Sequence, residues 1–251
     1  LYQEAEALLL HELGLDALDL SDEITYEHNF NDVAFAGRFD AQHFQPKYYR
    51  VLEAIKAIMP LQIVNLDSLL EEITNGQTPL HHDLSVGNVR FLTAEHILDY
   101  RINYDSDKRV EIEHHEKQLK KTQVKENDVL ITIKGRIGNV AVVEDVPFPT
   151  NINQDVGLLR LKKNIHPYYI AGFLNSQAGK ALIEQVCTGQ INPFLGLGNL
   201  RTVKIPIFEP ARMNELGEMI KAKVNEATET QKSAKQLLEN AKRRVEEMIL
   251  G

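Results

Sequence analysis

The chain contains a single cysteine, Cys187, and no tryptophan in 251 residues. One thiol excludes an internal disulfide and a cysteine-based metal site, so we expect a reducing, cytoplasmic setting in which Cys187 packs as a small core residue. No apolar stretch reaches the roughly 18 residues that a membrane-spanning helix requires, and we expect no membrane contact. The first residue, Leu1, falls inside a helical pattern and is not a methionine, which favours a fragment or a processed chain.

Motifs of catalytic sites are also missing. The sequence has no phosphate-binding loop, dinucleotide-binding glycine fingerprint, H-E-x-x-H pattern or nucleophile elbow, and no motif of amino-group DNA methyltransferases or nucleases. The pairs His81-His82 and His114-His115 suggest metal binding, but adjacent side chains diverge on a strand or a helix, so solvated loops are the better interpretation. We therefore expect no catalytic residue, no metal and no cofactor, and a function that depends on surfaces that bind.

The net charge of −8 argues at first against a nucleic-acid partner. The charge is unevenly distributed, however, because residues 1–75 contain 14 acidic and 4 basic side chains. Residues 76–210 contain 15 acidic and 16 basic side chains, and residues 211–251 contain 7 and 8. The acidity therefore belongs mainly to the N-terminal segment, and the middle of the chain is compatible with a local basic face.

The hydrophobic pattern predicts four segments. Residues 1–13 form a short amphipathic helix, and residues 14–40 form an acidic, aperiodic connector. Residues 41–208 begin with a helix near Pro46 and continue as a mixture of short helices and strands, which indicates an α+β fold and not a regular βαβ series. Residues 209–251 form a long helix of the coiled-coil type.

Within the mixed segment, β-type apolar runs and helical stretches are interleaved. Strands are predicted for residues 61–64, 89–92, 129–133, 140–143 and 157–161. Helices are predicted for residues 67–72, 94–98 and 167–186. The order of these elements is the basis of the α+β assignment.

The C-terminal helix contains a heptad repeat. Its apolar side chains recur in alternating steps of four and three residues. We call these positions the seam: Ile220, Val224, Ala227, Gln231, Ala234, Leu238, Ala241, Val245 and Met248. A seam needs a partner helix, and residues 1–13 are too short to cover all of it. The remainder is therefore expected to meet another chain or a missing part of this one.

The most informative stretch is residues 126–143, which read E-N-D-V-L-I-T-I-K-G-R-I-G-N-V-A-V-V. Two β-type runs flank a kink in which glycines bracket two cations, Lys134 and Arg136. This pattern predicts a hairpin that holds both cations at a rigid tip. Arg136 is suited to a bidentate contact with a guanine or a phosphate, so the tip is a candidate for nucleic-acid contact.

Two further polar turns have a composition suited to nucleic acid. Gln77 and Thr78 lie in an Asn-Gly-Gln-Thr-Pro turn whose amide and hydroxyl groups suit phosphates or base edges. Gln190 and Asn192 lie in a glycine-bracketed loop and suit adenine. Each cluster alone is better explained as an ordinary surface turn, but three in a chain without a catalytic motif shift the balance toward binding.

The amide side chains of Asn151, Asn153 and Gln154 have two possible roles. These amides suit either base contact or the capping of a strand, and the structural role is slightly favoured.

The order of these signatures resembles a target recognition domain of the specificity (S) subunits of type I restriction-modification systems. The resemblance covers residues 61–249, and its motifs are loose alone but specific as an ordered set. They read I-T-N-G-Q-T-P, V-R-F-L-T-A-E-H-I, N-D-V-L-I-T-I-K-G-R-I-G-N-V-A-V-V, N-I-N-Q-D-V-G-L-L-R-L, Y-Y-I-A-G-F-L-N-S-Q-A-G-K and T-G-Q-I-N-P-F-L-G-L-G-N-L-R-T-V-K-I-P-I-F. The N-terminal Y-Q-E-A-E-A-L-L-L-H-E-L-G-L looks like the end of the family's spacer helix, followed by G-R-F-D-A-Q-H-F-Q-P-K-Y-Y.

The resemblance implies a non-catalytic subunit that reads double-stranded DNA for a methyltransferase/endonuclease complex. Full subunits of this family carry two recognition domains separated by long antiparallel helices, which set the spacing of a bipartite site and dock two methylation subunits. Motor-nuclease subunits can join them. This chain holds one recognition domain, so the resemblance implies either the C-terminal half of a longer subunit or a half-subunit that pairs with a second copy of itself.

Two other functions remain open at this stage. The first is a structural coiled-coil interaction module that has no sequence preference for DNA, with the seam as its functional surface. The second is an enzyme that uses the histidine pairs. Neither the DNA sequence that would be read nor the oligomeric state follows from the sequence.

Overall fold

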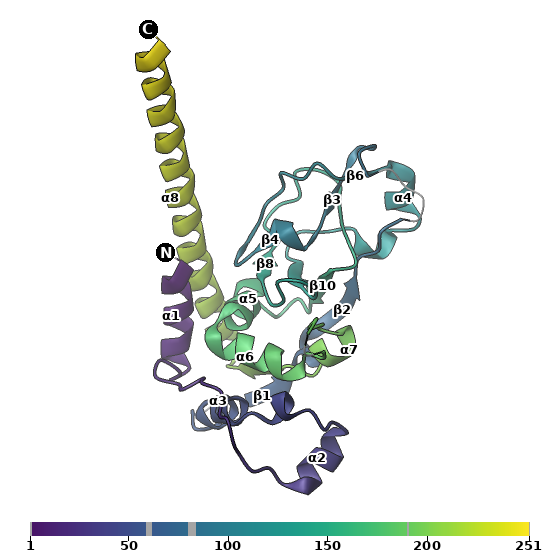
Figure 1. Cartoon of the computed structure of the whole chain (residues 1–251), viewed down its shortest axis with the longest axis vertical. Coiled ribbons are helices and arrows are strands. Elements are labelled where there is room, and N and C mark those ends of the chain that lie inside the picture. The colour runs from purple at the N-terminus through teal and green to yellow at the C-terminus, as the bar shows by residue number, and fades with distance from the viewer. Residues whose placement is uncertain (1, 59–61, 80–83, 190, 251) are drawn as a thin grey trace.

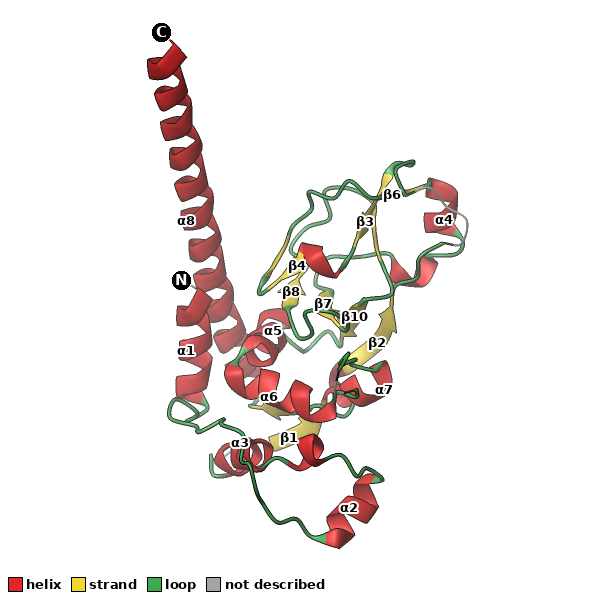
Figure 2. Ribbon diagram, viewed as in Figure 1, coloured by secondary structure: helices red, strands yellow, loops and turns green. Residues whose placement is uncertain are grey.

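The computed structural model describes residues 2–58, 62–79, 84–189 and 191–250. A mixed body of helices and strands lies beside the long helix α8 (Pro210–Leu250), whose C-terminal half extends beyond the rest of the molecule (Figure 1). Helices surround several small sheets, as Figure 2 shows, and the strands pair mostly antiparallel. This architecture confirms the predicted α+β class.

The remaining elements have the following bounds. The helices are α1 (Tyr2–Glu12), α2 (Phe30–Ala36), α3 (Pro46–Lys56), α4 (Ile112–Glu116), α5 (Pro167–Asn175), α6 (Gln177–Val186) and α7 (Leu197–Leu200). The 3₁₀ turns are η1 (Ala41–Phe44), η2 (Leu66–Leu69), η3 (Ala94–His96) and η4 (Lys120–Thr122). The strands are β1 (Gln62–Asn65), β2 (Leu70–Asn75), β3 (Val89–Leu92), β4 (Ile97–Leu98), β5 (Arg101–Ile102), β6 (Arg109–Val110), β7 (Val129–Thr132), β8 (Val140–Val142), β9 (Thr150–Ile152), β10 (Val156–Leu161) and β11 (Lys204–Ile207).

The central sheet has the strand order β2-β10-β7-β8, and each neighbouring pair is antiparallel. Its strand β7 is buried on both faces. Val129 and Ile131 belong to the larger hydrophobic core, whereas Leu130 belongs to a smaller cluster. Because side chains alternate between the faces of a strand, burial on both sides explains why this run is continuously apolar in the sequence.

The long helix α8 is packed along its first half only. Leu216, Ile220 and Val224 are buried, and α1 and α5 pack against this part of the helix (Figure 1). Farther along, Leu238 and Val245 are more than half exposed, at 56% and 54%. The seam is therefore covered over the part that the short helix α1 reaches, and its continuation faces solvent in this chain.

Three predicted helices are wrong in whole or in part. Residues 67–72 begin as η2 but continue as β2, and residues 94–98 form η3 followed by β4, because strand partners elsewhere in the chain override local preference. The stretch 167–186 is two helices. Ser176 ends α5 and caps α6, since its Oγ accepts a hydrogen bond from the Gly179 amide at 3.1 Å.

The acidic segment 14–40 contains a helix that its aperiodic sequence does not predict. The Asn29 side chain caps α2 by accepting a hydrogen bond from the Asn31 amide, and Gly37 ends the helix in the left-handed conformation. No residue of α2 is buried, and its Phe35 is 95% exposed. Local capping, and not packing, explains this helix.

Candidate nucleic-acid interface

Strands β7 and β8 form the hairpin that the pattern of residues 126–143 predicts. At its tip, Gly135 and Gly138 have φ angles of 71° and 89°, a region that residues with a side chain enter only at a cost. The Thr132 hydroxyl donates a hydrogen bond to the backbone oxygen of Arg136. The tip is therefore held to its strand, and its geometry requires Gly135 and Gly138, which flank Arg136 and Ile137.

The two cations of the tip have different surroundings. Arg136 is exposed, and its guanidinium has no hydrogen bond or ion pair within the part of the chain that the structure describes. The Lys134 Nζ lies 3.8 Å from a carboxylate oxygen of Asp155 and 5.3 Å from the ring centroid of Phe194. Arg136 is thus available to a ligand, whereas Lys134 is already partly neutralised.

The loop after α6 lies directly against this tip. Thr188 and Phe194 close the loop with two backbone hydrogen bonds of 3.0 and 2.8 Å, and the Leu195 amide donates to the Ile133 carbonyl at 3.0 Å. Asn192 is exposed on this loop. Gln190 lies outside the described residues. The hairpin tip and the predicted loop of Gln190 and Asn192 are therefore neighbours, although about 55 residues separate them in the sequence.

The turn that contains Gln77 and Thr78, at the end of β2, contacts the turn between β9 and β10. The Thr78 hydroxyl donates a hydrogen bond to the side-chain oxygen of Gln154, and the Asn75 amide nitrogen lies 3.3 Å from the Gln154 carbonyl. Gln77 is exposed beside them. The next residue of the turn is Asp155, which pairs with the lysine of the tip.

Two of the clusters adjoin one short segment, residues 151–155: the Gln77–Thr78 turn through Gln154 and the hairpin tip through Asp155. The loop after α6 adjoins the hairpin tip. We call the exposed or half-buried polar side chains of these clusters and this segment the polar face, which consists of Gln77, Thr78, Lys134, Arg136, Gln154 and Asn192. Amide, hydroxyl and guanidinium groups on one face offer both donors and acceptors, which is the chemistry that reads base edges and phosphates.

The structure distinguishes the roles of Asn151, Asn153 and Gln154, for which the sequence allows either base contact or strand capping. Asn151 is fully buried, and its Nδ2 donates hydrogen bonds to the Leu119 carbonyl and the Thr122 hydroxyl. Asn153 is also buried and bonds both the amide and the carboxylate of Asp155. These two are structural, and Gln154 is the exposed member of the group.

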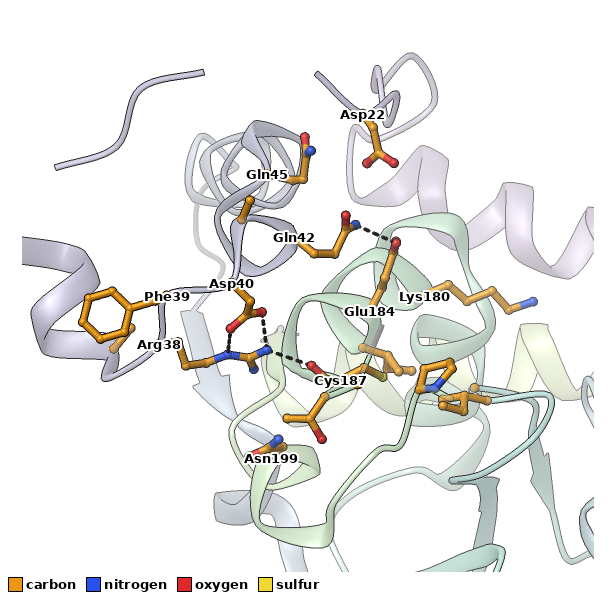
Figure 3. A pocket seen from close by; sticks show the side chains of 18 of the residues that line it. Asp22, Arg38, Phe39, Asp40, Gln42, Gln45, Lys180, Glu184, Cys187 and Asn199 are labelled. Carbon is orange, nitrogen blue, oxygen red and sulfur yellow. Dashed lines mark hydrogen bonds and ion pairs between the residues drawn. The ribbon is translucent and has the colours of Figure 1, made fainter. Parts of the chain in front are cut away.

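A cavity of about 1320 Å³ lies beside the polar face, between the segment before α3 and the end of α6 (Figure 3). Arg38 donates hydrogen bonds to the Asp40 carboxylate and to the backbone oxygen of Cys187. Gln42 donates to Glu184 at 3.0 Å. The sequence provides no local signal for these residues, because Arg38 and its partner on the loop are 149 residues apart.

Cys187 faces this cavity as a half-buried thiol. Burial, with a smaller effect from Glu184, raises the pKa of Cys187 to about 11. The thiol is therefore protonated at neutral pH, which agrees with a packing role and not with a nucleophile.

The histidine pairs do not assemble into a ligand set in the part that is described. His81-His82 lies outside the described residues. His115 is on α4, where its Nδ1 lies 2.5 Å from the Asn151 side-chain oxygen. Among the residues with described positions, no group of three or more His, Cys, Asp or Glu side chains is placed to hold a metal ion.

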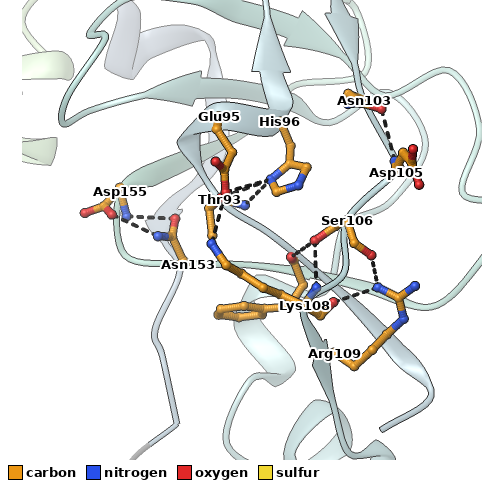
Figure 4. A network of polar contacts seen from close by, with 11 residues as sticks. Thr93, Glu95, His96, Asn103, Asp105, Ser106, Lys108, Arg109, Asn153 and Asp155 are labelled. Carbon is orange, nitrogen blue, oxygen red and sulfur yellow. Dashed lines mark hydrogen bonds and ion pairs between the residues drawn. The ribbon is translucent and has the colours of Figure 1, made fainter. Parts of the chain in front are cut away.

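A polar network lies around the end of β3, which belongs to a three-stranded sheet of order β6-β3-β9 (Figure 4). His96 and Thr93 form a capping box, and burial lowers the pKa of His96, so its neutral Nδ1 accepts a hydrogen bond from the Thr93 amide. The Ser106 hydroxyl donates to the Phe91 carbonyl and accepts from the Lys108 amide. These contacts account for the shape of the loop that follows β5 and bind the loop to β3.

None of the helices that the structure describes is long and apolar enough to cross a membrane. The longest, α8, carries charged side chains along its whole length.

Comparison with known proteins identifies one family. The type I restriction modification DNA specificity domain matches residues 61–237. This range contains the central sheet, the polar face and the packed half of α8. No curated protein matches the chain.

Three solved structures are similar to the chain. The HsdS subunit from Thermoanaerobacter tengcongensis is 15% identical, with a TM-score of 0.46 over 70% of this chain and 40% of that chain. The S subunit of a type I restriction-modification system from M. genitalium is 17% identical, with a TM-score of 0.44 over 64% and 37%. A structure that describes complex assembly and conformational transition of the type I R-M system is 14% identical, with a TM-score of 0.46 over 94% and 52%.

The aligned region covers 40%, 37% and 52% of these three chains. The present chain therefore spans about half of their length or less. The family match, by contrast, extends over well more than half of the present sequence and includes every residue of the polar face. The chain therefore belongs to the type I restriction-modification DNA specificity domain family.

Proposed function

We propose that the chain is a non-catalytic reader of double-stranded DNA that acts as one target recognition domain of a type I restriction-modification specificity subunit. One observation carries the proposal: three polar clusters that are far apart in the sequence lie next to one another, two of them at residues 151–155 and the third against the hairpin tip. Family membership supports it. In this proposal the domain reads one half-site of cytoplasmic DNA and directs a methyltransferase/endonuclease complex to it.

The residues of the polar face have distinct proposed roles. Arg136 makes a bidentate contact with a guanine or a phosphate, because its guanidinium is exposed and has no partner in the described chain. Gln77, Thr78 and Asn192 supply amide and hydroxyl groups to base edges or phosphates. Lys134 contacts the backbone. Gln190 is proposed as a base contact from its sequence position alone.

The helices supply the proposed assembly surface. Residues 1–13 are part of a spacer helix, residues 14–40 a connector, residues 41–208 the recognition domain, and residues 209–251 a spacer and docking helix. The exposed half of the seam supports this division, because its apolar side chains need a partner. We propose that this partner is a second recognition domain or a second copy of the chain, and that methylation subunits and motor-nuclease subunits join the assembly.

Substitution of Arg136 tests the reading function. We expect Arg136→Ala to weaken specific DNA binding by about 1–3 kcal/mol and to relax sequence preference at one position, because a bidentate base contact is lost. Binding is measured by gel shift on duplexes selected by the wild-type chain from a randomised pool. Arg136→Lys separates the two contacts, since it restores a phosphate contact but not a bidentate base contact.

Arg244, an exposed arginine near the far end of α8, provides the matched control. Arg244→Ala removes the same side chain away from the polar face and should leave the sequence preference unchanged. Equal effects of the two alanine variants, or no effect of Arg136→Ala, would contradict the assignment.

The alternative is a coiled-coil interaction module without sequence-specific DNA binding, and the exposed continuation of the seam favours it. Competition between selected and bulk DNA at several salt concentrations separates the two functions. A specific reader keeps its preference for the selected duplex as salt rises, because base contacts release few counterions. Loss of all preference at every salt concentration would favour the module.

A further inference from the structure

The 3₁₀ turn η4 presents two adjacent lysines beside the polar face. Lys120 and Lys121 are exposed, and neither ammonium has a hydrogen bond or an ion pair among the residues that the structure places. Their neighbour Lys117 differs, because its Nζ lies 2.8 Å from the Glu113 carboxylate. Two adjacent exposed cations therefore lie on this turn without an ion-pair partner among the described residues.

Buried side chains hold this turn in place. Leu119 and Thr122, which flank the two lysines, are 1% and 5% exposed. The Nδ2 of the buried Asn151 donates to the Leu119 carbonyl at 2.9 Å and to the Thr122 hydroxyl at 3.1 Å. The Thr122 hydroxyl also bonds the Leu119 carbonyl at 3.1 Å. The backbone under the lysines is thus preorganised, which lowers the entropy lost when the turn meets a ligand.

The same buried amide places the turn beside the polar face. Asn151 lies three residues before Gln154, which bonds Thr78, and four residues before Asp155, which pairs with the lysine of the hairpin tip. The turn η4 also packs against β2. In Figure 2 the arrowhead of β2 points toward the region around α4, from which the chain enters η4.

Charge distinguishes the turn from the polar face itself. On the polar face, Asp155 partly neutralises Lys134, so few free positive charges remain there. Neutral amides and one guanidinium select bases, but the electrostatic part of DNA affinity comes from cations that displace counterions from phosphates. The lysines of η4 supply unpaired charge at the border of that face.

We propose that Lys120 and Lys121 bind the phosphate backbone of the duplex next to the bases that the polar face reads, and that they contribute affinity without sequence preference. This inference rests on the proposed DNA-reading function. Lysine acts as a flexible point charge and carries no geometric code for a base pair, so its contribution is the same on any sequence. The buried Asn151 is a positioning residue for the pair.

The test compares two double variants of the full chain. Lys120→Gln with Lys121→Gln removes the proposed phosphate contacts. Lys162→Gln with Lys163→Gln removes the same charge from another exposed pair, which follows the opposite end of β10 because Leu161 pairs with Leu70 and not with the end of β2. Fluorescence anisotropy is measured on a duplex selected by the wild-type chain and on a random duplex of equal length, each over a range of salt concentrations.

We expect the η4 variant to lower the slope of log K against log salt by about 2, at roughly 0.9 per lost phosphate contact. Both duplexes should weaken by the same factor, so that the specificity ratio stays unchanged. The control variant should keep the wild-type slope. Circular dichroism and thermal melting of the η4 variant should match wild type, because both side chains are exposed and have no hydrogen bond or ion pair in the described chain. The control variant should keep the wild-type circular dichroism and melt slightly lower, because Lys162→Gln removes the hydrogen bond from Nζ to the Ser68 carbonyl at 2.6 Å.

Three outcomes overturn the inference. An unchanged slope in the η4 variant shows that the lysines do not meet phosphates, and equal losses in both double variants show only a general effect of charge. A loss confined to the selected duplex shows that they read bases. The proposed reading function fails on a different result, namely a wild-type chain that does not prefer the selected duplex. If the wild-type chain binds neither duplex, the reading function and the role of the two lysines both fail.

Discussion

Two glycines of the family-like motifs, Gly76 and Gly135, are required for different physical reasons. A Cβ atom added at Gly76 would lie 2.0 Å from the backbone oxygen of Ile152 and 2.2 Å from that of Asn153. A Cβ atom at Gly135 would meet no atom within 4 Å, but its φ of 71° disfavours a side chain. The first glycine permits two backbone segments to touch, and the second permits a turn.

This difference predicts unequal costs for the same substitution. Gly135→Ala should lower the free energy of unfolding by about 1–2 kcal/mol, the cost of the left-handed conformation. Gly76→Ala should cost more, because residues 151–155 must move away from β2 to admit the methyl group. Urea denaturation of the two variants measures both values. Equal costs would show that the close approach at Gly76 relaxes easily.

At the level of single residues, the sequence predicts residues of the polar face but not the residues that lie around it. Lys134 and Arg136 could be predicted to lie at a tip, because the bracketing glycines determine the turn locally. The position of Arg38 could not, since its contacts are with α6 and the following loop. Lys120 and Lys121 lack a distinctive motif, and their significance depends on the distant Asn151 beneath them.

Among the secondary-structure elements, one arginine of the central sheet joins β10 and β2 to the residue that directly precedes β7. Arg160 on β10 forms a bidentate ion pair with Asp128, at 2.9 Å for each bond, and a further ion pair with Glu72 on β2 at 2.7 Å. The Asp128 side chain is 1% exposed. A nearly buried carboxylate in this position depends on its partner to offset the loss of hydration.

Removal of Arg160 alone should therefore be costly. We expect Arg160→Leu to lower the free energy of unfolding by about 3–5 kcal/mol, because it leaves a buried charge without its partner. The double variant Arg160→Leu with Asp128→Asn should lose less than the single variant, since the stranded charge is gone. Denaturant titration of the single and double variants forms the test. Additive losses would show that the pair is not coupled.

Elements were predictable from the sequence where their determinants are local. The β7–β8 hairpin follows from its turn residues and its flanking apolar runs. The pattern of residues 67–72 predicts a helix, but β2 begins at Leu70 because β10, almost 90 residues later, supplies its partner strand. Strand β11 also depends on a distant partner. It includes Pro206, which disfavours a strand, and it is held by pairing with β1 in a two-stranded sheet.

In the whole molecule, the exposed part of the seam has no partner helix among the residues that the structure describes. Substitution of Leu238 and Val245 by aspartate should prevent assembly through α8 and leave the thermal melting temperature of the chain nearly unchanged, because both side chains are already exposed. Sedimentation equilibrium of the chain, alone and with methylation subunits, measures the assembled mass.

Gln236→Asp with Asn240→Asp adds the same charge on positions outside the seam and is the matched control. This control should retain the wild-type mass. If the seam variant and the control have the same mass as wild type, the exposed seam is not an assembly surface.

The length of the exposed half of α8 is related to the helical repeat of B-DNA. Residues 228–250 span roughly 34 Å at ~1.5 Å per residue, which is close to the ~34–36 Å of one turn of B-DNA. A module fixed about 34 Å along this helix, with the helix parallel to the duplex, would be displaced by about one full rotation of the grooves. Under the proposed DNA-reading function, two modules at that separation would approach the DNA from the same side and bind without twisting the duplex between them.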